Sequence, residues 1–64
     1  MSSPDALPRV GAPAARALAG LGITSLDQLA GHSRAQLEAT HGIGPKALGL
    51  LEEALAERGL RLAD

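Results

Sequence analysis

The sequence contains no cysteine and no aromatic residue, and each absence excludes a class of protein. Without cysteine there is neither a disulfide nor a thiolate metal site, which fits a reducing compartment such as the cytoplasm. Without phenylalanine, tyrosine or tryptophan the chain has no aromatic ring on which the bases of a single strand could stack. The apolar residues are 13 Ala, 12 Leu, two Ile, one Val and one Met. The core must therefore consist of leucines packed against alanine-lined helices.

Long apolar runs and an excess of positive charge are also missing. No stretch approaches the roughly 18 residues of a membrane-spanning helix, and residues 1–5 lack the basic start and apolar run of a signal peptide. We therefore expect a cytoplasmic protein outside the membrane. The net charge is −1, whereas nucleic-acid-binding proteins usually carry a clear excess of lysine and arginine. Any binding to nucleic acid must then depend on local geometry.

The chain length of 64 residues predicts one domain, spanning residues 1–64. We expect this domain to be a monomer. A domain of this size buries only about 60% of the surface that its unfolded chain exposes. Its core is expected to supply about 3 to 5 kcal/mol of net stability.

Capping residues and prolines predict five short helices and no sheet. Each helix has its own start or stop signal. The first helix opens at Pro4 and is ended by Pro8, and the second runs from Ala12 to a C-terminal cap at Gly22. The linking helix, at about 24–31, is capped by Thr24 or Ser25, with Asp27 or Gln28 completing a capping box. The fourth helix covers residues 34–40 after a capping box of Ser33 and Gln36, and the fifth covers residues 45–58 and is closed by Gly59.

The leucines of these helices recur at spacings of three and four residues, which is typical of helices with one buried face. The predicted core contains nine large apolar residues: Leu18, Leu21, Leu26, Leu29, Leu37, Ile43, Leu48, Leu51 and Leu55.

An internal repeat is visible when the chain is shifted by 33 residues, because Val10-Gly11 then coincides with Ile43-Gly44. Each copy later reaches a glycine followed by an aliphatic residue, at Gly22 and at Gly59. This pattern predicts a first unit at about 4–22, the linking helix, and a second unit at about 33–59.

The segment HGIGPKAL, starting at His41, resembles the helix-hairpin-helix family, whose motif places an apolar residue between two glycines before a helix that opens with Pro-Lys. Over nearly its whole length the chain is similar to the tandem helix-hairpin-helix domain at the C-terminus of bacterial RNA polymerase α subunits. The resemblance implies an all-α, SAM-like fold of five short helices in two units related by a pseudo-twofold axis. It also implies a bacterial source and contact of both hairpins with duplex DNA across the minor groove, mostly without sequence preference.

The chain departs from the polymerase domains in its first unit. Pro13 stands where those domains carry a DNA-contacting arginine, and Arg16 stands where they carry an asparagine. We therefore do not expect binding to AT-rich promoter elements in the polymerase manner.

The second hairpin is the predicted phosphate-binding site. A helix start leaves backbone N–H groups unpaired and carries a partial positive charge, so it favours an anion. Pro45 has no N–H, which leaves the N–H groups of Gly44, Lys46 and Ala47 as donors, and Lys46 adds an ammonium group. Gly42 and Gly44 lack the Cβ that would obstruct a phosphate or forbid a positive φ. Ile43 is predicted to turn inward and hold the hairpin in shape.

The first hairpin is predicted to be the weaker site. Arg9 replaces the first glycine and Pro13 replaces the lysine, so one flexible position, one positive charge and one N–H donor are lost. Secondary DNA contacts are expected at Arg9, Gly11 and Arg16.

Neither an enzyme nor a metal site is predicted. The serines and threonines at helix starts are explained as caps, and no nucleophile, base and orienting acid form a set. His32 and His41 are nine positions apart with no cysteine and no carboxylate cluster beside them. We therefore expect no cofactor. The leading hypothesis is weak duplex-DNA binding. The alternative is a protein-interaction module that keeps the fold without DNA binding, and the net charge of −1 and the altered first hairpin both favour it.

Overall fold

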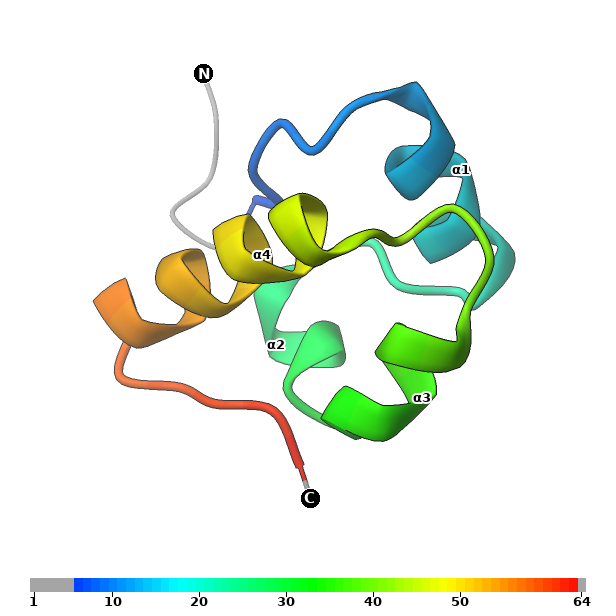
Figure 1. The fold of residues 1–64 in the computed structure, drawn as a ribbon. Coiled ribbons are helices and arrows are strands. Elements are labelled where there is room, and N and C mark those ends of the chain that lie inside the picture. Colours follow the sequence, from blue (N-terminus) through cyan, green and yellow to red (C-terminus); the bar gives the residue numbers. More distant parts are fainter. Residues whose placement is uncertain (1–5, 64) are drawn as a thin grey trace.

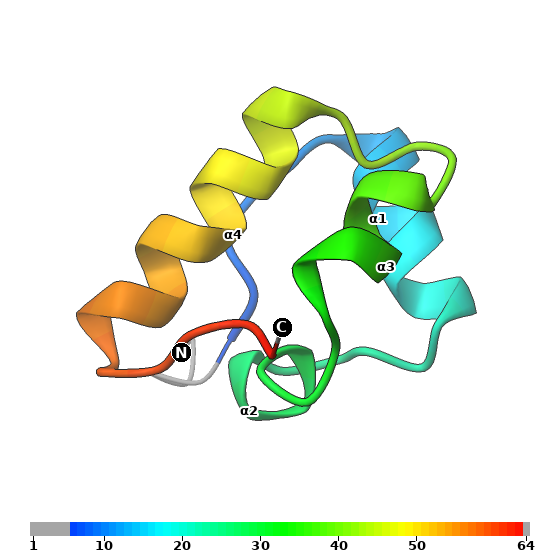
Figure 2. The same ribbon diagram turned by 60° about the horizontal axis from the view of Figure 1, so that its bottom comes forward.

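Four helices surround the core in the computed structural model, which describes residues 6–63 of the chain (Figure 1). They are α1 (Ala12–Gly20), α2 (Leu26–Leu29), α3 (Arg34–Ala39) and α4 (Pro45–Glu57). The longest, α4, lies along one side, and the three shorter helices face it (Figure 2). These residues contain no strand, so the predicted small all-α domain is confirmed for them. None of the four helices is long and apolar enough to cross a membrane.

The helix predicted at the N-terminus is not found among the described residues. Its expected start, from Ser3 to Asp5, lies outside them, and residues 6–10 form no helix. Pro8, within this segment, has no N–H to donate to a helical hydrogen bond. Leu7 and Val10 instead pack, half-buried, against the core. The described part of the chain therefore has four helices rather than five.

Side-chain caps explain where the two shortest helices begin. Ser25 caps α2 by accepting a hydrogen bond from the N–H of Gln28 at 3.2 Å, and Ser33 caps α3 by accepting one from the N–H of Gln36 at 3.0 Å. The side chain of Gln28 accepts a second bond from the N–H of Thr24 at 2.6 Å. Of the alternatives drawn from the sequence, Ser25 is thus the cap and Gln28 its partner. Caps of this kind contribute about 1 kcal/mol each.

The two longest helices end in the same way. Gly22 has φ +77° and Gly59 has φ +72°, a conformation that glycine adopts at little cost. The next residue donates its N–H back to a carbonyl five positions earlier, from Ile23 to Leu18 at 2.9 Å and from Leu60 to Leu55 at 2.8 Å. This is the Schellman arrangement. The predicted C-terminal caps at both glycines are confirmed.

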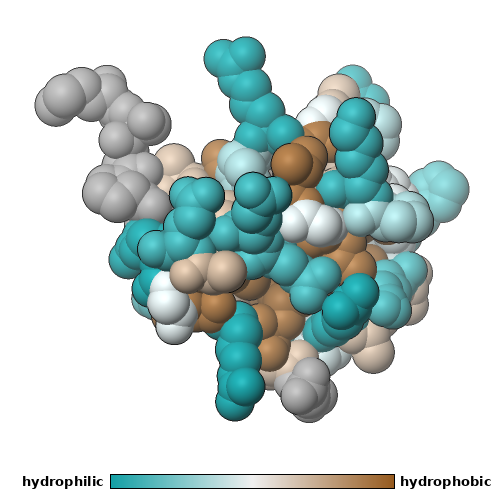
Figure 3. All heavy atoms as spheres, turned by 60° about the vertical axis from the view of Figure 1, so that its left-hand side comes forward, coloured by the Kyte–Doolittle hydropathy of each residue, from teal (hydrophilic) through white to brown (hydrophobic). Residues whose placement is uncertain are grey.

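The core consists of leucine, isoleucine and alanine side chains from all four helices and from the segments that connect and follow them. On the face drawn in Figure 3, hydrophobic residues are visible between outward-extending hydrophilic side chains. Eight of the nine predicted core residues are buried. Leu21 is the exception, because it lies just past the last residue of α1 and is only half-buried. The Schellman turn directs Ile23 inward in its place, with 2% of its surface exposed. Buried residues that were not predicted are Ala14, Ile23, Ala47 and Leu62.

The chain turns back after α4, and the following segment passes beside α2 (Figure 2). Ala63 donates its N–H to the carbonyl of His32 at 3.0 Å and accepts the N–H of Arg34 at 3.1 Å. These two bonds form an isolated parallel bridge between Ser33 and Ala63. They place Leu62 in the core, so the end of the described chain contributes to the fold.

Candidate nucleic-acid interface

The predicted hairpin joins α3 to α4 through residues 40–44. The N–H of Thr40 bonds to the carbonyl of Leu37 at 3.1 Å, and the N–H of Ile43 bonds to the carbonyl of Thr40 at 3.2 Å. Gly42 between them has φ +99°, which confirms the predicted positive φ. Ile43 is 6% exposed and belongs to the core, so its inward orientation is also confirmed.

Gly42 also lies against the first turn of α1. A Cβ at this position would come within 2.8 Å of the carbonyl oxygen of Pro13 and within 3.4 Å of the Cβ of Ala17. Real Cβ atoms essentially never approach another heavy atom more closely than 3.0 Å. The glycine is therefore required both by its backbone conformation and by this contact, which brings the hairpin beside the start of α1.

The start of α4 offers the three N–H donors that the sequence predicts. Its first helical bond runs from the N–H of Leu48 to the carbonyl of Gly44 at 2.9 Å. Within residues 6–63, the N–H groups of Gly44, Lys46 and Ala47 have no backbone acceptor. Ala47 is a core residue with 7% exposure, so its side chain offers little surface to a ligand.

The start of α1 offers as many donors as the start of α4, which corrects one prediction. Its first helical bond runs from the N–H of Ala15 to the carbonyl of Gly11 at 2.9 Å, and Pro13 is the second residue of the helix. Pro13 lacks an N–H, but the equivalent of Pro45 is Ala12, which has one. The predicted loss of a donor in the first unit is thus compensated, whereas the lysine has no equivalent at the start of α1.

The turn before α1 differs from the hairpin before α4 in its backbone. Gly11 has φ +92°, whereas its counterpart Gly44 has φ −89°. Arg9, the counterpart of Gly42, has no positive φ, and no helix precedes it among residues 6–10. The first turn therefore does not connect two helices in the described part of the chain.

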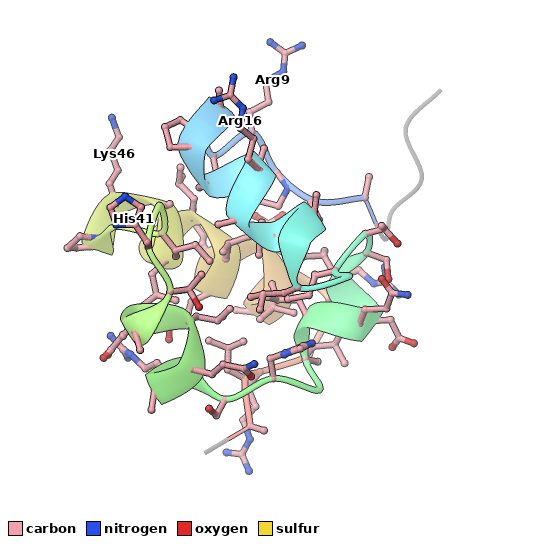
Figure 4. The ribbon with its side chains drawn as sticks, turned by 90° about the vertical axis from the view of Figure 1, so that its right-hand side faces the viewer. Arg9, Arg16, His41 and Lys46 are labelled. Carbon is pink, nitrogen blue, oxygen red and sulfur yellow. The ribbon has the colours of Figure 1, made fainter. Side chains whose placement is uncertain are left out.

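Four basic side chains gather on the side of the molecule where both helix starts lie. Figure 4 shows Arg9, Arg16 and Lys46 extending outward from this side, with His41 on the hairpin next to Lys46. All four residues are exposed. Their side chains form no hydrogen bond or ion pair with any other residue of the described chain. We call these four residues the basic face.

Arg34 does not belong to the basic face, although its place in the sequence lies between the two turns. Its Nε is 3.3 Å from Oε1 of Glu38 and its Nη1 is 3.3 Å from Oε2 of Glu52. The first pair lies within α3 and the second connects α3 to α4, so the guanidinium already has two acidic partners. The positive charge available to a phosphate is therefore concentrated on the basic face.

The two histidines occupy different environments. Nδ1 of His32 lies 2.9 Å from Oε1 of Gln36, which ties the ring to the start of α3. His41 is exposed on the hairpin. No group of three or more His, Cys, Asp or Glu residues that could hold a metal ion occurs within residues 6–63.

Comparison of this chain with protein families, with curated proteins and with solved structures finds no match.

Proposed function

We propose that this protein binds duplex DNA weakly, with little sequence preference, through phosphate contacts at the start of α4. The observation that carries the proposal is the position of three unpaired N–H donors, from Gly44, Lys46 and Ala47, on the same side as the basic face. The proposed role is non-catalytic and needs no cofactor. We further propose that the protein is a monomer in a bacterial cytoplasm. Its two units are proposed to be related by a pseudo-twofold axis, as in the polymerase domains.

The chemistry of the site favours a phosphate over a neutral group. The macrodipole of α4 places about half a positive charge at its first turn, and the unpaired N–H groups point toward an approaching anion. A Cβ at Gly44 would meet nothing within 4 Å, so this position is open to solvent. The ammonium of Lys46, which has no acidic partner within residues 6–63, adds a full charge beside the same donors.

The contact between Gly42 and Pro13 makes the site extend over two elements. It holds the hairpin against α1, which carries Arg16, while Arg9 directly precedes that helix. One phosphate at the start of α4 and a second beside the arginines would thus lie on one continuous surface. Since α1 brings no lysine to its own start, the hairpin before α4 is proposed to supply most of the affinity.

The affinity should be low because few phosphates are contacted. With about two to four phosphates neutralised, we expect a dissociation constant of about 10⁻⁴ to 10⁻⁵ M at physiological salt. A titration of the ¹⁵N-labelled protein with a short duplex at low salt measures the affinity and the surface used. Amide shifts are expected in residues 41–47 and around Arg9 and Arg16.

Charge-reversal variants test the assignment of the site. Lys46→Glu should abolish measurable binding, because it removes a charge-assisted contact of about 1.5 to 3 kcal/mol and places an anion beside the phosphate. Arg61→Glu is the matched control, since it changes the net charge equally at an exposed position in the segment after α4, away from the hairpin (Figure 1). Arg9→Ala and Arg16→Ala should each weaken binding only partly.

Two results would contradict the proposal. If Arg9→Ala or Arg16→Ala weakened binding more than Lys46→Glu, with unchanged circular dichroism, the phosphate site would not be at the start of α4. If the duplex did not bind at about 20 mM salt, where electrostatic attraction is strong, the alternative of a protein-interaction module would replace DNA binding.

A further inference from the structure

A groove of about 380 Å³ separates α3 from α4 below the hairpin. The uncharged part of its lining comes from the end of the hairpin and the first turns of α4, at Ile43, Gly44, Pro45, Leu48 and Gly49. This volume is at the lower end of the roughly 300 to 1,000 Å³ that ligand pockets occupy. The groove therefore has room for one or two side chains rather than for a large cofactor.

The edge of the groove is acidic. Arg34, Glu38 and Glu52 line it, so two carboxylates face one guanidinium and the local charge is −1. Both ion pairs measure 3.3 Å, longer than the roughly 2.7 to 2.9 Å of a strong charge-assisted hydrogen bond. Each carboxylate uses one oxygen in these pairs, and within residues 6–63 the other oxygen has no partner. The edge therefore has acceptor capacity left for another cation.

Gly49, which lines the same groove, is an unusual residue for its position in the chain. It lies inside α4, where glycine is less favourable than every residue except proline. Its φ is not positive, and a Cβ at this position would meet nothing within 4 Å. Neither the backbone nor the packing of this chain requires a glycine there. The consequence of its missing side chain is a more open groove beside Leu48.

We propose that the groove binds a short segment of a partner protein in which an aliphatic side chain is followed by lysine or arginine. The aliphatic side chain would cover Leu48 and Gly49, and the basic group would pair with Glu38 or Glu52. Two carboxylates at the edge repel an acidic peptide, so charge complementarity selects a basic segment. The groove contains no residue of the basic face, although it adjoins the proposed phosphate site at Gly44, and its occupation does not require DNA binding.

Three capped hexapeptides probe the groove in ¹⁵N-labelled protein. The first has the sequence Gly-Ser-Leu-Arg-Ser-Gly; the second has glutamate in place of arginine; the third has alanine in place of leucine. The first should shift the amides of Leu48, Gly49 and Glu52 at millimolar concentration. The glutamate peptide should bind about fivefold more weakly, because an attractive exposed ion pair becomes repulsive. The alanine peptide should bind about tenfold more weakly, because less apolar surface is buried.

Gly49→Ala tests the groove from the side of the protein. The added methyl group should weaken the leucine-arginine peptide about fivefold, while circular dichroism shows a helical content at least as high as before, since alanine is the better helix former. Gly20→Ala is the matched control, because this glycine is also helical and exposed, has open space around its Cβ, and lies in α1, outside the groove. It should leave peptide binding unchanged.

The proposal is overturned if Gly49→Ala binds the peptide as well as the unmodified protein does, or if the glutamate peptide binds equally well. Shifts of the groove amides that grow with protein concentration, without peptide, would show that a second copy of the chain occupies the groove instead. Shifts of the same amides on addition of duplex DNA would assign the groove to nucleic acid.

Discussion

Replacing Gly42 by alanine should destabilise this protein more than the same change at any other glycine with a positive φ. Two costs arise at Gly42. The φ of +99° is unfavourable for an L-residue, and the new Cβ would lie 2.8 Å from the carbonyl oxygen of Pro13. At Gly22 the φ is +77°, and a Cβ would meet nothing within 4 Å. Gly22→Ala is therefore a matched control that has the backbone strain without the contact.

The backbone strain and the contact with Pro13 each contribute to the expected loss of stability. An L-residue in the left-handed region costs about 1 to 2 kcal/mol, which is the expected loss for Gly22→Ala. Forcing an additional carbon into a packed site costs about 1 to 3 kcal/mol more. Gly42→Ala should thus lower the free energy of unfolding by about 2 to 5 kcal/mol. Since the whole domain is expected to have about 3 to 5 kcal/mol, this variant should be close to unfolded at room temperature.

Thermal and urea unfolding followed by far-UV circular dichroism measure both variants. Each kcal/mol should lower the melting temperature by about 4 to 8 °C for a domain of this size. The quantity of interest is the difference between the variants, about 1 to 3 kcal/mol, which isolates the contact of the hairpin with α1. Equal unfolding midpoints for Gly42→Ala and Gly22→Ala would refute the reasoning, because the contact with Pro13 would then contribute nothing.

Three further predictions concern binding, the core and the caps. The slope of log K against log salt for duplex binding should be about −2 to −4, and a slope near −10 would show many more phosphate contacts than the basic face can make. Leu51→Ala removes a side chain with 0% exposure and should cost about 2 to 5 kcal/mol in urea unfolding; Leu50→Ala, at 36% exposure, should cost much less, and equal losses would contradict the assigned core. Ser33→Ala should lower the free energy of unfolding by about 1 kcal/mol, whereas an unchanged midpoint would mean that the cap of α3 is not formed.

Local interactions made much of the fold predictable from the sequence. Ser33 caps α3 through a bond to a residue three positions later, and Gly22 ends α1 through bonds within the same turn. Eight of the nine predicted core residues are buried, and most of these were found from the spacing of the leucines, because a helix repeats its faces every 3.6 residues. The N–H donors at the start of α4 were predictable for the same reason, since they depend only on where the helix begins.

Other features depend on partners far away in the sequence, and the sequence alone did not indicate them. Leu62 is buried because Ala63 pairs with His32, and neither residue has a local signal for this contact. Arg34 lies between the two turns in the sequence, but its guanidinium pairs with Glu52 on another helix.

The site shows the same division between local and long-range interactions. The sequence motif around Gly42 was enough to indicate its positive φ, because that motif determines the turn. Only the tertiary structure showed that the carbonyl of Pro13 lies against Gly42 and that Arg9, Arg16 and Lys46 share one side of the molecule. Bonds within one turn depend on neighbouring residues, whereas contacts between helices depend on how the whole core packs.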